Sequence, residues 1–237
     1  MTQAAHPAVP AADHAQRVVR IGMVAAVYAA LTLVALTLLG SLAWGPIQFR
    51  VSEALCVLAL FTADAIPGLA LGCAVANLFN IVISGTGMLG MLDVVFGALA
   101  TALGAWFTWH FRKRPVLALA GPVITNALIV PAYLPLMLEG IGYYTIPFTN
   151  IMLDGAYPAM YVFGLLATGL GEAVVVYALG LPLARALART PLPRMLGAES
   201  PFAPEGAKAE GPVADGEPGA GAPGAASTGT HDPHPHQ

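Results

Sequence analysis

The chain alternates long apolar runs with short polar or glycine-rich breaks. Runs of about 20 apolar residues are long enough for one helix to cross the roughly 30 Å hydrocarbon core of a bilayer. Such runs lie at residues 21–43, 66–83, 89–111, 116–138 and 157–187. A sixth run, residues 52–61, is short and marginal as a span. The pattern predicts an all-α integral membrane protein, a compact bundle of six transmembrane helices.

The basic residues indicate how this bundle is oriented. Cytoplasmic loops of membrane proteins carry an excess of Lys and Arg. With six spans both termini lie on one side, and that side collects nearly all the bases that flank the spans: Arg17, Arg20, Arg112, Lys113, Arg114, Arg185, Arg189 and Arg194. The opposite side has Arg50 alone. We therefore expect both termini to be cytoplasmic.

Composition supports a membrane protein with polar tails. The chain is 57% hydrophobic and 10% charged, whereas soluble domains average about 25% charged residues. With a formal net charge of −3, we expect no nucleic-acid partner. After residue 190 the sequence becomes rich in Pro, Gly and Ala, a composition that cannot bury enough apolar area to order itself. We expect a polar cytoplasmic tail at 1–19, a membrane domain at 20–190 and a disordered cytoplasmic tail at 191–237.

A polar run interrupts the apolar body between the first two spans. Gln48, Arg50, Ser52 and Glu53 lie close together in it. One interpretation is an interfacial loop in which Ser52 caps the next helix, Glu53 favours its dipole and Arg50 snorkels to headgroups. The other is a recognition surface, because ionisable groups within a membrane are expensive and mark functional sites.

Other polar side chains fall within the predicted spans. Asn77 and Asp93 lie near the outward ends of the third and fourth spans, whereas Asn126 and Glu172 lie deep in the fifth and sixth. Three of the four also have a structural interpretation: Asp93 can cap its helix, Asn126 can hydrogen-bond between helices, and Glu172 can be protonated or paired.

Enzymatic chemistry has little support in the sequence. A P-loop and a Rossmann glycine fingerprint are both absent, so no known motif predicts nucleotide hydrolysis. The intramembrane polar residues have no metal-ligand spacing, and no Ser–His pair lies within the predicted spans. We expect a binding or transport protein, without a metal or other cofactor.

Four segments carry a resemblance to a known family. They are GPIQFRVSEAL at 45–55, IPGLALGCAVAN at 66–77, LDVVFGALAT at 92–101 and GEAVVVYALGLP at 171–182. Together with the short second helix, they resemble the QueT family of substrate-binding S components of energy-coupling factor (ECF) transporters. The resemblance covers about residues 19–188 and leaves out both tails.

The resemblance implies a division of labour in a bacterial cell membrane. The S component would capture a queuosine precursor outside the cell, a 7-deazaguanine such as preQ1 or preQ0. A transmembrane T component and two ATPase subunits, which use ATP and Mg, would supply the energy. The small-residue face of the first helix matches the position that docks on the T component, here Ala25, Ala26, Ala29 and Ala30.

The resemblance also suggests roles in a substrate site. Glu53 would accept hydrogen bonds from the guanine-like ring, and Asp93 would pair with the amine of an aminomethyl group. Gln48, Arg50, Asn77 and Asn126 would supply further hydrogen bonds, and Tyr143, Tyr144 or Phe148, in the loop before the sixth span, would stack on the ring. Glu172 is either structural or a further ligand contact. Two alternatives stay open: a stand-alone carrier with Glu172 or Asp93 as its proton site, and an S component for another vitamin.

Overall fold

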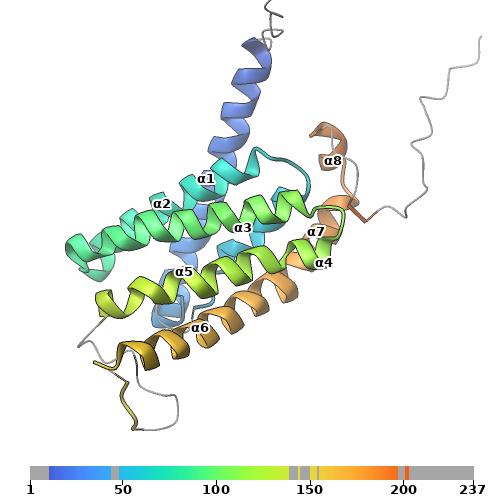
Figure 1. The fold of residues 1–237 in the computed structure, drawn as a ribbon. Helices are drawn as coiled ribbons and strands as arrows, with labels where there is room; N and C mark the ends of the chain where they lie inside the picture. The colour runs from blue at the N-terminus through green and yellow to red at the C-terminus, as the bar shows by residue number, and fades with distance from the viewer. Residues whose placement is uncertain are drawn as a thin grey trace, which may run out of the picture. The chain divides into compact units, whose positions relative to one another are not determined.

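The computed structural model describes residues 11–43, 48–138, 144, 150–153, 155–196 and 201–202, except the side chains of residues 11–13, 41 and 194. Within these residues the chain consists of helices and connecting loops without a β-strand (Figure 1). Tyr143, Phe148 and residues 203–237 lie outside the described part, so the stacking role of these two aromatic residues and the predicted disorder of the tail stay predictions.

Five helical segments are long and apolar enough to cross a membrane. The first two lie in the helices α1 (Ala11–Leu39) and α2 (Ala65–Ser84). The other three are composite segments, Gly87–His110, Pro115–Leu138 and Tyr157–Ala188. All five overlap the predicted long runs, which confirms an all-helical protein with multiple spans.

The three composite segments change helix type along their length. The third contains the 3-10 helix η3 (Gly87–Gly90), the π-helix η4 (Asp93–Gly97) and α3 (Ala98–His110). The fourth contains α4 (Pro115–Ala118) and α5 (Ala120–Leu138). The fifth contains α6 (Tyr157–Ala173), the π-helix η5 (Val174–Gly180) and α7 (Leu181–Ala188).

The predicted second span is a ten-residue 3-10 helix, η2 (Val51–Leu60). At about 2.0 Å per residue it is about 20 Å long, which is shorter than the hydrocarbon core. Eight of its ten residues are buried, and it contacts α1, α2, α3, η5 and α7. This segment is therefore a central core element surrounded by longer helices.

The short helix draws the preceding loop into the protein. Its Ser52 hydroxyl accepts a hydrogen bond from Thr32, well inside α1, and Gln48 and Arg50 are both at least 95% buried. The interfacial-loop interpretation, in which Arg50 reaches headgroups, is therefore wrong. The side chain points into the bundle because η2 is too short to lift its first turn to the surface.

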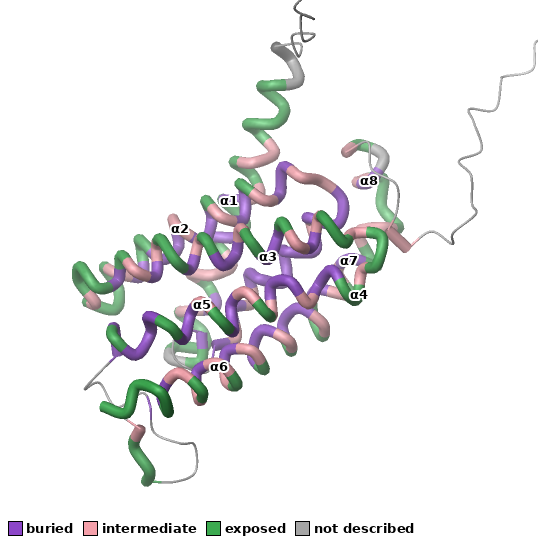
Figure 2. Tube along the Cα trace, in the orientation of Figure 1, coloured by how far each residue is buried: buried purple, intermediate pink, exposed green. Residues whose placement is uncertain are grey.

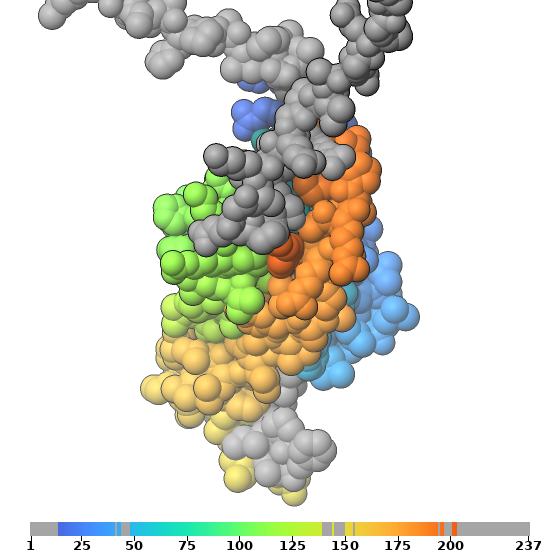
Figure 3. Space-filling model, turned by 90° about the vertical axis from the view of Figure 1, so that its right-hand side faces the viewer, coloured from blue at the N-terminus to red at the C-terminus, as the bar shows by residue number. Residues whose placement is uncertain are grey.

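The long helices pack in order around η2. α1 packs on α2, α2 on α3, α3 on α5 and α5 on α6. Their outer faces carry exposed Leu, Val, Ile and Phe side chains, whereas the buried residues line the inner faces (Figure 2). In the space-filling view, the segment from α6 to α7 lies between the α3–α5 side and α1 (Figure 3).

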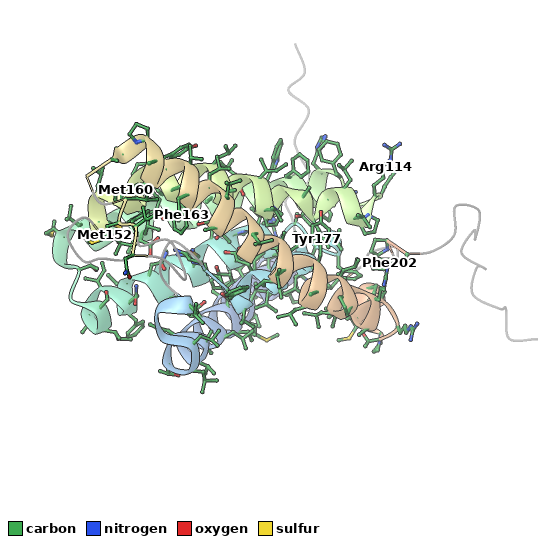
Figure 4. The ribbon with its side chains drawn as sticks, turned by 90° about the horizontal axis from the view of Figure 1, so that it is seen from below. Arg114, Met152, Met160, Phe163, Tyr177 and Phe202 are labelled. Carbon is green, nitrogen blue, oxygen red and sulfur yellow. The ribbon has the colours of Figure 1, made fainter. Side chains whose placement is uncertain are left out.

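Apolar clusters close both ends of the bundle. Met160 and Phe163 lie near the start of α6 and pack with Leu134 and Tyr144. Tyr177, toward the other end, packs with Leu119 and partly buried Phe202, and its hydroxyl donates to the carbonyl of Val116 (Figure 4).

Helical structure and packing extend beyond residues 20–190 at both ends. α1 begins at Ala11, and its Arg17 and Arg20 side chains pair with Asp64 at the start of α2, with N–O distances of 2.9 and 2.7 Å. Beyond residue 190, the short helix α8 (Leu192–Met195) is followed by Leu196, which packs on the bundle.

Close contact between α1 and α2 depends on Gly72. A Cβ atom there would lie 2.7 Å from the Ala25 carbonyl oxygen and 2.7 Å from the Tyr28 Cβ. We expect Gly72→Val to lower the melting temperature of the detergent-solubilised protein, since overpacking costs about 1–3 kcal/mol. Gly22→Val is the matched control, because a Cβ atom at Gly22 meets nothing within 4 Å. Equal melting temperatures for the two variants would contradict this packing.

Candidate functional site

A group of buried polar side chains occupies the centre of the apolar bundle. We call it the polar cluster; its members come from the loop before η2, from η2 itself, and from α2, η4 and α6: Gln48, Arg50, Glu53, Asn77, Asp93 and Glu172. All six are at least 95% buried. Buried charges in an apolar medium are costly unless they are paired or serve a function.

Arg50 and Asp93 form the ionic centre of the polar cluster. The guanidinium Nη2 lies 3.2 and 3.4 Å from the two carboxylate oxygens of Asp93. Tyr133 of α5 donates to the same carboxylate at 2.6 Å, and Asn77 donates to the Asp93 backbone carbonyl at 2.8 Å. This centre ties the loop before η2 to α2, η4 and α5.

Glu53 forms a second centre, with neutral partners. Its Oε1 accepts hydrogen bonds from the hydroxyls of Tyr28 and Thr101, at 2.5 and 2.8 Å. Its Oε2 accepts one from the Cys56 thiol at 3.0 Å. Glu53 therefore connects η2 to α1 through Tyr28 and to α3 through Thr101.

The loop before η2 and the end of α6 meet at the polar cluster, and they carry Gln48 and Glu172. Glu172 is buried there, with 2% of its surface exposed. The neighbouring Gly171 packs so tightly on the Gln48 backbone that a Cβ atom at residue 171 would overlap the Gln48 carbonyl oxygen. A glycine is therefore needed here for the loop to reach α6.

Helix irregularities accompany two of the carboxyl groups. Asp93 is the first residue of the π-helix η4, and Glu172 precedes the π-helix η5 by two positions. Single turns of π-helix inside α-helices are frequent at functional sites. In η4 the turn leaves Gly97 beside Asn77 and Asp93, where a Cβ atom would come within 2.9 Å of the Asn77 amide nitrogen.

Several buried polar atoms have no hydrogen-bond partner among the described residues. They are Gln48 Nε2, Asn80 Oδ1, Asn126 Oδ1 and Glu172 Oε1. Most buried polar atoms in proteins are satisfied, so each exception needs an explanation such as a bound molecule. Asn126 lies two helical turns before Tyr133 and therefore on the same inward face of α5.

The predicted aromatic and docking residues are distributed differently. Tyr144 is fully buried and packs edge-on against Phe163, with ring centroids 6.3 Å apart. On α1, Ala25 and Ala29 are buried within the chain, whereas Ala26 and Ala30 are exposed. The exposed pair is thus available to another protein, and the buried pair is in contact with this chain's own helices.

Two tyrosines and a threonine of the two centres were not among the predicted site residues. Tyr28, Thr101 and Tyr133 are buried and donate to Glu53 or Asp93. A buried tyrosine hydroxyl needs a partner, so tyrosines in the middle of predicted spans are a usable signal. The partners themselves depend on how the helices pack.

A separate surface depression lies beside α4 and η5. Its volume is about 550 Å³, and it is lined by Arg114, Val116, Leu117, Tyr177 and neighbouring residues (Figure 4). Apart from Arg114 the lining is mostly apolar, and none of the polar cluster takes part.

The polar cluster is suited to binding a polar molecule rather than to catalysis. Among the described residues, no group of His, Cys, Asp and Glu side chains has the arrangement of a metal site. The polar cluster instead offers donors and acceptors at fixed positions in a dry interior, as binding sites for small polar solutes do.

Comparisons with known proteins agree with a binding and transport role. The family model described as "QueT transporter" matches residues 18–189. A similar protein, "Queuosine precursor transporter QueT" of Lactococcus lactis subsp. cremoris (strain MG1363), is 36% identical over 84 residues, which is 35% of this chain and 44% of that protein. This chain therefore matches less than half of that relative's length.

No solved structure matches the chain. The family match covers η2, every residue of the polar cluster and the apolar spans, except the first four residues of the first span. A transporter family accounts for both the multi-pass membrane architecture and the absence of known catalytic motifs from the sequence. The chain belongs to the QueT transporter family.

Proposed function

We propose that this chain is the substrate-binding S component of an ECF transporter and that it captures a queuosine precursor of the 7-deazaguanine class. The observation that carries the proposal is the polar cluster with its unpartnered atoms Gln48 Nε2 and Glu172 Oε1. The similar transporter from Lactococcus lactis is named for queuosine precursors, which supports this choice of substrate.

The chemistry of a 7-deazaguanine complements these atoms. Its ring has N–H and amino donors and a carbonyl acceptor, and it is flat. Gln48 Nε2 would donate to the ring carbonyl, and Asn126 Oδ1 would accept from a ring donor. A site built to pair such groups rejects analogues that lack them, because its own buried atoms would stay unpaired.

The structure refines the roles proposed for the two carboxylates with protein partners. Glu53 already accepts from three side chains, and Asp93 already pairs with Arg50 and Tyr133. In this proposal they hold the walls of the site, with Arg50 and Asn77 positioned by Asp93. Contacts to the ligand then come first from Gln48, Glu172 and Asn126, and Tyr144 supports the aromatic end of the bundle.

The arrangement of the spans supports entry from outside the cell. The helices run antiparallel, so Arg17, Arg112 and Arg185 lie toward one end of the bundle, while Asp93 and Tyr133 lie closer to the other. If the basic end is cytoplasmic, Asp93 and Tyr133 lie toward the outer half of the membrane. The predicted partners, a T component and two ATPases, would then act from the membrane and the cytoplasm.

A second candidate, a stand-alone proton-coupled carrier, is favoured by one observation. Glu172 is a buried carboxyl group with an unpartnered oxygen, as a proton site would be. The two candidates differ in their energy source. Uptake that persists when the ATPases are inactivated would identify a carrier.

Substrate binding by the full chain in detergent tests the proposed substrate. We expect titration calorimetry to show saturable binding of a 7-deazaguanine and none of an unrelated vitamin. Gln48→Leu should weaken binding about tenfold, since a lost hydrogen bond costs about 1.4 kcal/mol. Thr108→Val is the control, because Thr108 is buried but bonds backbone carbonyls of α3 and α4. Tight binding of a different vitamin, without any deazaguanine, would overturn the substrate assignment.

Complex formation tests the ECF assignment. We expect Ala26→Trp and Ala30→Trp to prevent co-purification with the T component, because a large side chain separates helices that small residues let approach. Substrate binding by the isolated chain should be unchanged, since both alanines are exposed. Ala178→Trp, at an exposed position on η5, is the matched control. Co-purification of all three variants at the wild-type level would contradict docking through α1.

A further inference from the structure

The charges of the polar cluster indicate which side arm the substrate carries. We propose that Glu172 is the specificity-determining residue of the site and recognises a positively charged amine. A 7-deazaguanine with an aminomethyl arm would then be preferred over one with an uncharged cyano arm. This inference rests on the proposed function, because it takes the deazaguanine ring as given.

Carboxyl groups outnumber cations in the polar cluster. Its described members include one guanidinium, Arg50, and the three carboxyl groups of Glu53, Asp93 and Glu172. The other described buried carboxylate, Asp64, has its own two arginines at the start of α2. The polar cluster is therefore short of positive charge.

The one cation is already engaged by Asp93. The guanidinium lies within 3.2 to 3.4 Å of both Asp93 oxygens. Glu53 is satisfied by neutral donors, the hydroxyls of Tyr28 and Thr101 and the thiol of Cys56. Neither carboxylate needs a ligand to complete its hydrogen bonds.

Glu172 differs from the other two carboxyl groups. It is 2% exposed, and no donor among the described residues reaches its Oε1. A ligand ammonium would provide both the missing donor and the missing charge, in a charge-assisted hydrogen bond. A cyano group has no N–H and no charge, so it would leave this oxygen unpaired.

Gln48 provides an internal reference for the same site. Its amide nitrogen is a second buried polar atom without a partner among the described residues, and the Gln48 backbone packs on Gly171, the residue before Glu172. In the proposed site the Gln48 amide is a neutral donor to the ring carbonyl, and both ligands have this carbonyl. Substitution of Gln48 should therefore affect both ligands, whereas substitution of Glu172 should affect one.

The test measures the affinity of the full chain in detergent for both ligands. We expect the aminomethyl form to bind about 30-fold more tightly than the cyano form, since a charged hydrogen bond contributes about 2 kcal/mol. Glu172→Gln should abolish most of this preference by weakening the aminomethyl form about tenfold or more, with the cyano form within about threefold of wild type.

Two variants keep the result interpretable. Glu172→Asp retains the charge and should retain the preference for the amine. Gln48→Leu should weaken the binding of both ligands about equally and leave the ratio of their affinities unchanged. A ratio of two affinities does not depend on the fraction of folded protein, so partial misfolding of a variant cannot imitate the expected result.

Three other outcomes would each decide the matter. Equal or tighter binding of the cyano form by the wild-type chain would overturn the proposal while leaving the substrate class intact. An equal loss of affinity for both ligands in Glu172→Gln would show that Glu172 contacts the shared ring or supports the fold. This result would also overturn the proposal that Glu172 recognises the amine. Failure of both ligands to bind the wild-type chain would overturn the proposed function itself.

Discussion

The buried ion pair between Arg50 and Asp93 is the constraint on which the rest of the site depends. Removing a guanidinium from water costs several kcal/mol, which only close, well-oriented partners can offset. The side chain of Arg50 finds its partner on η4, 43 residues further along the chain. The loop before η2 must therefore enter the bundle, and Asn77 and Tyr133 must close around the same carboxylate.

The remainder of the fold provides an apolar setting for that pair. The long helices turn Leu, Val, Ile and Phe outward, as expected for contact with lipid, and use small residues where backbones meet. The polar side chains at the centre of the bundle are held by hydrogen bonds from several elements.

The fold was largely predictable, and the reason is the length of the apolar runs. A bilayer requires every backbone group to be satisfied within its segment, so a long apolar run is a helix. The same argument fails for η2, because a ten-residue run does not specify helix type or depth. The π-helices at Asp93 and Glu172 were also not predictable, since they depend on how neighbouring helices pack.

For the candidate site, the sequence by itself determined which ionisable residues lie among the apolar spans. Such residues are rare in a membrane because burying them there costs free energy, so each one points to a site. The sequence also determined that no known nucleotide-hydrolysis motif accompanies them. Tertiary structure decided which of these groups are satisfied. Glu53 and Asp93 look like ligand contacts in the sequence, yet packing supplies them with Tyr28, Thr101 and Arg50. The described part of the chain offers no partner to one oxygen of Glu172. The physical reason is the same, because hydrogen-bond partners come from distant segments and only the folded chain brings those segments together.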